Sequence, residues 1–508
     1  MNTYLGLELG STRIKAISIN EKYKTISSGD YTWQSDFNEG IWTYDLSEAW
    51  IGIKTALQSI EKRDNIKAVG ISGMMHGYLA FDENWNLLVP FRTWQNTITS
   101  KAASELTELF RFNIPQRWSI AHLYQAVLNG EKHIEKIAHI TTLAGYIHYM
   151  LTGVNAVGIG EASGIFPINS NKYDYDEQMI EKFDKLIKNK GIAWKIKEIL
   201  PKVLVAGEKA GSLTESGNKL IDNLLPVGVP FAPPEGDAGT GMVATNSVTA
   251  KTGNVSAGTS IFSMVVLEKP LKNLHEEIDM VTTPDGKPVA MVHCNNCTND
   301  SNAWISLFKE TTELFDVQLQ TKDLYTNLYK KSLEADDDCG GVFVCNYMSG
   351  EGITGFDTGI PFIVRKPDCR FTLSNFMRAT LYSTMATLKI GMDILTDENV
   401  EIDVLTGHGG LFKTHGVGQK YMAAVCNTPI TCMETASEGG PYGMAVLASY
   451  LFYSKESLEE YLKNQVFKEV AMETLYPENN ITKGFERYFT DYKKILQIEK
   501  AAITALGK

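Results

Sequence analysis

Cysteine is scarce in this sequence, with only 7 among 508 residues. An odd and sparse set argues against a disulfide framework, so we expect free thiols. Cys294 and Cys297 form a C-x-x-C pair, but a zinc ribbon needs a second such pair and the other five cysteines do not supply one. The sequence therefore predicts buried or semi-buried structural thiols in preference to a zinc site.

Long apolar runs and basic stretches are also missing. No uninterrupted apolar segment approaches the ~18 residues of a membrane-spanning helix, and residues 1–20 alternate apolar and polar positions where a signal peptide would have an apolar core. The 60 acidic residues outnumber the 48 basic ones, which gives a formal net charge of −12. These absences predict a cytoplasmic protein that binds neither a membrane nor nucleic acid.

What remains is ordinary globular composition, with 44% hydrophobic and 21% charged residues. The length exceeds the ~250–300 residues at which a single hydrophobic core stops growing, so we expect two domains. Strand-like segments alternate with helical patterns over residues 45–60, 375–395, 417–426 and 442–453, and the charged tail 456–508 also reads as helical. This alternation predicts an α/β fold.

A short pattern occurs twice, about half of the chain apart. The segments TYLGLELGSTRIKAISIN and TAKTGNVSAGTSIFSMVVLE each read as a β-hairpin with a Gly-Ser-Thr or Gly-Thr-Ser turn. A segment rich in Gly and Pro precedes the second hairpin, which places the domain boundary near Val248. We therefore predict two domains of related build, residues 1–247 and residues 248–508.

Both turns are candidate phosphate sites. Gly10, Ser11 and Thr12 leave backbone N–H groups and hydroxyls pointing outward beside Arg13, and Glu8 could hold a hydrated Mg²⁺ nearby. The alternative for this segment is a hairpin turn with solvated charges. The second turn adds Gly258, Thr259 and Ser260, so a polyphosphate could lie between the two hairpins. Backbone without side chains at Gly407, Gly409 and Gly410 would let a nucleotide approach closely.

Three further segments carry polar groups suited to chemistry. Asp237 precedes a run of small residues and is either a helix N-cap or a functional acid. His76 follows a strand, where a structural histidine is the alternative, and Trp94, Gln95 and Asn96 form a polar group beside an aromatic ring that suits hydroxyl recognition or a packed turn. A P-loop motif is absent, and GTGMVA at residues 239–244 lacks the preceding strand of a dinucleotide site.

The order of these motifs resembles the FGGY carbohydrate kinase family, in its xylulokinase-like branch. The segments that carry the resemblance span nearly the whole chain: GLELGSTRIK, GISGMMHG, TWQNT, GDAGTG, SAGTS, TGHGG and GGPYGMAVLA. The resemblance implies an ATP-dependent sugar kinase with two actin/hexokinase-type (ribonuclease H-like) domains around a central cleft. It also implies ATP and Mg²⁺ as cofactors, a small sugar as partner, and a family in which homodimers are common.

The resemblance also implies roles for single residues. Asp237 corresponds to the catalytic base and, with Glu8, to the metal site, while Met75, His76, Trp94, Gln95 and Asn96 correspond to the sugar site. The residues that correspond to the nucleotide site are Gly10, Ser11, Thr12, Arg13, Gly258, Thr259, Ser260, Gly407, Gly409 and Gly410.

Several positions depart from the family pattern. Glu8 stands where the family usually has Asp, Asn96 replaces an acid, His122 stands where many members have Lys, and Tyr382 stands where an acid or amide is expected. The leading hypothesis is a kinase acting on a terminal hydroxyl of a ketose such as xylulose. The alternatives are a catalytically weak regulator that binds sugar or nucleotide, and a sugar-independent ATPase of the same fold.

Overall fold

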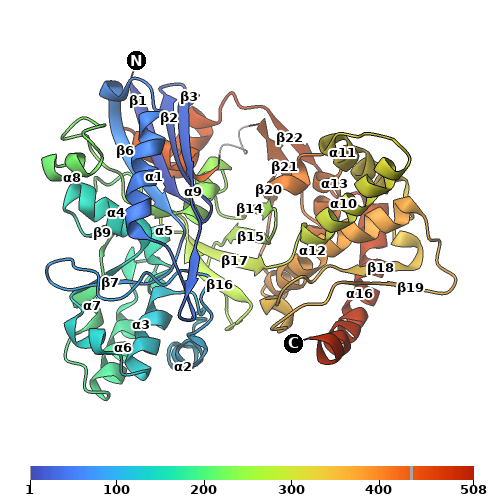
Figure 1. Ribbon diagram of the computed structural model, residues 1–508, viewed down its shortest axis with the longest axis horizontal. Coiled ribbons are helices and arrows are strands. Elements are labelled where there is room, and N and C mark those ends of the chain that lie inside the picture. Colours follow the sequence, from blue (N-terminus) through green and yellow to red (C-terminus); the bar gives the residue numbers. More distant parts are fainter. Residues whose placement is uncertain (1, 435–438, 508) are drawn as a thin grey trace.

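Two mixed β-sheets, one in each half of the chain, organise the structure (Figure 1). The computed structural model describes residues 2–434 and 439–507. The strands of the first sheet are, in spatial order, β3 (Thr25–Thr32), β2 (Arg13–Asn20), β1 (Thr3–Leu9), β6 (Ile66–Gly73) and β13 (Glu235–Gly236). Those of the second are β16 (Ile278–Thr282), β17 (Pro288–Cys294), β15 (Ile261–Val266), β14 (Thr252–Ala257), β20 (Val404–His408), β21 (Ile430–Met433) and β22 (Met472–Leu475).

The two sheets share one pairing pattern. In the first, β2 pairs antiparallel with β3 and β1, and β6 pairs parallel with β1 and β13. In the second, β15 pairs antiparallel with β17 and β14, and β20 pairs parallel with β14 and β21. Both predicted hairpins are therefore confirmed, and each occupies the same place in its sheet.

Helices cover the two sheets. The longer ones in the first half are α1 (Leu46–Gln58), α2 (Ser100–Phe110), α3 (Ser119–Leu128), α4 (Leu143–Thr152), α6 (Glu177–Lys188) and α9 (Asp237–Ala244). Those in the second are α10 (Asn299–Leu314), α11 (Thr321–Lys331), α12 (Leu373–Asp397), α13 (Gly418–Cys426), α14 (Gly440–Tyr450) and α16 (Asn479–Leu506). The helices expected at 45–60, 375–395, 417–426 and 442–453 are confirmed within a few residues.

Shorter elements connect these layers. The remaining strands are β4 (Asp36–Asn38), β5 (Ile41–Thr43), β7 (Leu79–Phe81), β8 (His139–Thr141), β9 (Ala156–Gly158), β10 (Ile168–Asn169), β11 (Asp174–Tyr175), β12 (Lys202–Leu204), β18 (Val342–Cys345) and β19 (Phe362–Arg365). The short helices are α5 (Ile159–Ala162), α7 (Ile196–Ile199), α8 (Glu215–Leu220) and α15 (Leu458–Tyr461). The helical tail predicted over residues 456–508 is confirmed at α15 and α16. It is wrong at β22, where Met472–Leu475 pairs with β21 and joins the second sheet.

One segment of the second half packs on the first sheet. Helix α14 lies against β1, and a Cβ at Gly6 would come 1.9 Å from the backbone oxygen of Pro441. This glycine therefore allows the helix to approach the strand directly. Residues of α14 join Tyr4, Ile17 and Ile19 in one hydrophobic core.

The β16–β17 hairpin makes a second connection. Figure 1 shows it between the two lobes, the first built around the β1 sheet and the second around the β14 sheet. Asn113 donates from Nδ2 to the backbone oxygens of Ile278 at 3.0 Å and Glu276 at 3.1 Å. Thr282 Oγ1 donates to the backbone oxygen of Ile159 at 3.0 Å. The lobes are thus joined on two sides, and the domain boundary near Val248 stays a prediction.

All seven cysteines are free, and four of them are buried. Within residues 2–434 and 439–507, no group of three or more histidine, cysteine or acidic side chains could hold a metal ion. Over the same residues no helix is both long and apolar enough to cross a membrane.

A buried carboxyl in the second lobe makes stability depend on pH. Burial raises the pKa of Glu351 to about 7, although N–H groups of Asn296 lower it. Between the unfolded pKa near 4.5 and this value the folded state keeps a proton that the unfolded state loses, so stability falls as pH rises. Glutamine does not titrate. We therefore expect the stability of Glu351→Gln, relative to that of wild type, to be higher at pH 8 than at pH 5. Thermal unfolding of both proteins at both pH values measures this, and a difference independent of pH would contradict it.

Candidate active site

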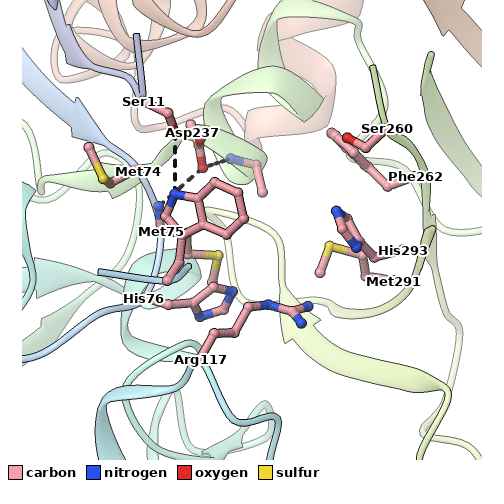
Figure 2. A pocket seen from close by; sticks show the side chains of 12 residues that line it. Ser11, Met74, Met75, His76, Arg117, Asp237, Ser260, Phe262, Met291 and His293 are labelled. Atoms are coloured by element: carbon pink, nitrogen blue, oxygen red, sulfur yellow. Dashed lines mark hydrogen bonds between the residues drawn. The ribbon is translucent and has the colours of Figure 1, made fainter. Parts of the chain in front are cut away.

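A hollow of about 250 Å³ lies between the two lobes (Figure 2). Both halves of the chain contribute side chains to its wall. The first half supplies Ser11, Met74, Met75, His76, Trp94, Arg117, Asp237 and Ala238, and the second supplies Ser260, Phe262, Met291 and His293. Six of these residues belong to the sites that the sequence predicts, namely Ser11, Met75, His76, Trp94, Asp237 and Ser260.

Asp237 is the carboxylate on the wall of this hollow. It is the first residue of α9, and Gly236 occupies the N-cap position, so the capping alternative does not describe it. Its Oδ1 accepts from the backbone N–H of Ala238 at 2.9 Å and of Met75 at 3.2 Å. Burial raises the pKa of Asp237 to about 6, and these N–H groups lower it. The carboxylate is therefore fixed in place, ionised at neutral pH, and able to accept a proton.

Glu8, on β1, lies close to Asp237. Burial raises its pKa to about 7, the charge of Asp237 adds to this rise, and Lys15 opposes it. Lys15 faces Glu8 across the β1–β2 ladder. A buried carboxylate beside a second one is a donor set that suits a hard divalent cation such as Mg²⁺.

His76 has an unusual backbone conformation. Its φ of +72° lies in the left-handed region, and Gly77 follows at +84°. Strain of this kind in a non-glycine residue is concentrated at functional sites. Burial, with the charge of Arg117, lowers the pKa of the ring well below its ordinary value, so the ring is neutral. Its Nδ1 lies 3.4 Å from the backbone oxygen of Gly164, and the ring lines the hollow.

Aromatic side chains hold the first turn. Trp33 Nε1 donates to the backbone oxygen of Gly10 at 2.8 Å, and the Tyr44 hydroxyl donates to that of Ser11 at 2.8 Å. Trp94 Nε1 donates to Ser11 Oγ at 3.2 Å. Thr12 is exposed beside them. Arg13 points elsewhere, because its guanidinium pairs with Asp30 on the surface at 3.3 Å.

The second turn meets the glycine-rich loop. Gly258 donates its N–H to the backbone oxygen of Ser260 at 2.9 Å, while Thr298 Oγ1 and Cys297 N donate to the oxygens of Gly258 and Thr259. Strand β20 runs parallel to β14 and pairs Gly407 with Val255. Gly409, with a φ of +99°, lies directly against the end of β14, where a Cβ would come 2.4 Å from the backbone oxygen of Ala257. A Cβ at Gly410 would come 3.9 Å from the same oxygen, which is an ordinary van der Waals contact.

The Trp94-Gln95-Asn96 triplet lies where two hollows meet. The exposed Trp94 lines both of them, whereas Gln95 and Asn96 line only the neighbouring one. Asn96 donates to the backbone oxygens of Trp42 and Thr93 and accepts from Trp42 N, so its amide secures the chain. The amide that stands here in place of the family's usual acid therefore holds the backbone of Trp42 and Thr93.

The other two departures lie in the cores. His122 is fully buried and its ring stacks on Tyr78. Tyr382 is buried in α12, where it packs against Tyr421 and donates to the backbone oxygen of Asp337.

The other six wall residues are not among the predicted site residues: Met74 and Ala238, which adjoin Met75 and Asp237, and Arg117, Phe262, Met291 and His293. Arg117 precedes α3 and pairs with Asp279 of β16, while His293 stands on β17 and stacks against Phe262. Figure 2 shows Arg117 and His293 reaching the hollow from opposite lobes. No motif marks them, because only the packing of β17 against the first lobe brings them to the cleft.

Comparison with known sequences decides the family. The pattern of the FGGY family of carbohydrate kinases, N-terminal domain, matches residues 3–244, and that of its C-terminal domain matches residues 253–452. The chain belongs to the FGGY family of carbohydrate kinases. It is 22% identical to the xylulose kinase of Haemophilus influenzae over 97% of this chain and 100% of that protein. It is 21% identical to the xylulose kinase of Escherichia coli over 90% of this chain and 92% of that protein.

Solved structures agree on the fold of this FGGY kinase. The ligand-bound xylulose kinase of Lactobacillus acidophilus superimposes with a TM-score of 0.81 at 15% identity, covering 100% of this chain and 99% of that one. Plasmodium falciparum glycerol kinase with ADP gives a TM-score of 0.78 at 15% identity, covering 98% of both. The predicted two-domain actin/hexokinase-like fold is confirmed. The protein is an ATP-dependent sugar phosphotransferase.

Proposed function

We propose that this FGGY kinase transfers the γ-phosphate of ATP to a terminal hydroxyl of a ketose such as xylulose. The observation that carries the proposal is the position of Asp237, a buried and fixed carboxylate on the wall of a cleft that also contains Ser11 and Ser260 of the two turns. The similarity to xylulose kinases across nearly the whole chain supports a ketose acceptor.

In this proposal Asp237 receives the proton of the attacking hydroxyl. Phosphoryl transfer proceeds through a loose transition state, so it depends on positioning and on neutralising oxygen charge. The N–H groups of Met75 and Ala238 hold the Asp237 carboxylate in one orientation. A base with a pKa of about 6 is ionised at neutral pH. Such a base suffices, because the sugar hydroxyl loses its proton late in the loose transition state.

The two turns and the glycine-rich loop hold the nucleotide. Their N–H groups and the hydroxyls of Ser11, Thr12, Thr259 and Ser260 supply donors to phosphate oxygens. Gly409 and Gly410 are exposed and leave backbone for the rest of the nucleotide to contact, whereas Gly407 is buried against the Phe412 ring. Arg13 pairs with Asp30 on the surface, so we assign it no phosphate contact.

The carboxylates of Glu8 and Asp237 suit a magnesium ion, and we assign the ion to them. The ion, when bound, supplies charge neutralisation at the phosphate oxygens. The positive charge of Lys15 favours the ionised form of Glu8, because it opposes the rise in the pKa of that carboxyl.

Replacement of Glu8 should expose this role. We expect Glu8→Ala to raise the Mg²⁺ concentration for half-maximal turnover by about tenfold or more, because the ion loses a charged ligand. Glu8→Asp, which restores the residue usual in the family, is the matched control and should stay within about threefold of wild type. Mg²⁺ titrations of ADP release and of ATP binding measure both variants. An unchanged titration for Glu8→Ala would remove Glu8 from the metal site.

ADP release from Mg·ATP across ketopentoses, 6-deoxyketohexoses, ketohexoses and polyols, with a blank lacking sugar, tests the proposed function. A sugar that raises the rate well above the blank is the expected result. A rate equal to the blank with every sugar, while ATP still binds, would favour the regulator that binds without transfer. A high rate in the blank would favour the sugar-independent ATPase.

A further inference from the structure

A second hollow of about 540 Å³ continues from the first. Trp94, Arg117 and His293 line both, so the two meet at these side chains. The wall beyond them comes from α2, the loop before α3, and the β16–β17 hairpin. Asp237 stands at the near end of this continuous space, in the first hollow only.

The second hollow is lined with groups that suit hydroxyls. Amide side chains line it, namely Gln95, Asn96, Asn113, Gln116 and Asn295, together with hydroxyls on α2 such as that of Ser104. The amides of Asn96, Asn113 and Asn295 already donate to backbone oxygens. The Oε1 atom of Gln116 is buried without a hydrogen-bond partner among the described residues, and such an unused acceptor is costly.

Electrostatics favours a neutral ligand there. The one basic side chain on this wall, within the described part of the chain, is Arg117, and Asp279 of β16 pairs with it. Glu276 adds a further acid, and the His293 ring is neutral because burial and Arg117 lower its pKa to about 3. An anionic tail would meet uncompensated carboxylate charge, whereas sugar hydroxyls would meet amides and one oriented guanidinium.

The junction can hold the middle of such a ligand. The Trp94 side chain is 37% exposed and borders both hollows, which is the placement of an apolar platform for a sugar backbone. Arg117 and His293 face each other across the first hollow (Figure 2). An acceptor that reacts at Asp237 and passes these side chains would extend toward Gln116.

From this geometry we infer that the acceptor is a neutral ketose of six or seven carbons, whose end remote from the phosphorylated hydroxyl lies in the second hollow. The inference rests on the proposed function and narrows its ketose acceptor to one longer than the xylulose named for its relatives.

The test compares kcat/KM for ketopentoses, ketohexoses and a ketoheptose with Mg·ATP. We expect the best six- or seven-carbon ketose to exceed the best ketopentose by about tenfold or more, since a recognised polar group is worth at least that much. Ser104→Trp, at an exposed position of α2 that borders the second hollow, should reduce this advantage to below about threefold. Glu108→Trp, exposed on α2 and away from both hollows, is the matched control and should preserve it.

Each other outcome is informative. A ketopentose that is the best acceptor, a sugar acid that exceeds every neutral ketose, or an equal loss for all acceptors in Ser104→Trp would overturn the inference and leave the kinase proposal standing. An absence of sugar-dependent ADP release from every acceptor would overturn both. Thermal unfolding checks that Ser104→Trp is folded, and Gln116→Ala, with the same expected loss of selectivity, serves if it is not.

Discussion

Replacing Asp237 with Asn should lower turnover by at least ~10²-fold while ATP and sugar still bind within about tenfold of wild type. The amide has nearly the same shape, and its oxygen can still accept from Met75 N and Ala238 N, so the start of α9 should keep its geometry. What the amide loses is the ability to take the proton of the attacking hydroxyl. Steady-state turnover, with equilibrium binding of each ligand, separates the two effects.

A second Asp→Asn change controls for the loss of a charged N–H acceptor. Asp184 on α6 accepts from Ile196 N at 2.8 Å and does not line either hollow. We expect Asp184→Asn to keep turnover within about twofold, because surface substitutions away from special features have small effects. Near-normal turnover in Asp237→Asn would refute the assignment of the base, whereas loss of both ligands would show a folding defect.

The second large effect concerns Gly409. Alanine there would adopt a strained φ of +99° and place its Cβ 2.4 Å from the backbone oxygen of Ala257, which is fixed in β14. The loop must therefore move away from the second turn. We expect Gly409→Ala to weaken ATP binding by at least ~10-fold, since strain of ~1–3 kcal/mol would be relieved by displacing the loop. Sugar binding in the absence of nucleotide should stay close to wild type.

Gly416 provides the matched control. It has a φ of +75°, but a Cβ there meets nothing within 4 Å. Gly416→Ala therefore carries the conformational strain without the steric conflict. Isothermal titration of ATP into both variants compares them. Equal affinities would mean that the close approach of Gly409 to β14 does not shape the nucleotide site.

The sequence predicts much of the fold because the informative signals are local. The alternation of Leu5, Leu7 and Leu9 before Gly10 encodes a strand and a turn within a few residues, and the structure has both. The same holds for the hairpin at residues 252–266. At β22 the local signal fails, because Met472–Leu475 becomes a strand only by pairing with β21.

The candidate site shows the same limit. Asp237, His76 and Trp94 occur in short motifs, and the structure brings them to one hollow. Arg117 and His293 belong to no motif, and they reach that hollow because the β16–β17 hairpin packs on the first lobe. Arg13 shows the reverse case, since its motif suggests a phosphate contact and the structure pairs it with Asp30.

The most direct test of the kinase is the simultaneous quantification of ADP and sugar phosphate in one reaction, for wild type and Asp237→Asn. Mass spectrometry of the acceptor gives the sugar phosphate, and a coupled assay gives ADP. We expect equal amounts of the two products in wild type and a loss of both by at least ~10²-fold in the variant. ADP formed without sugar phosphate, or an unchanged yield of sugar phosphate from Asp237→Asn, would contradict this expectation.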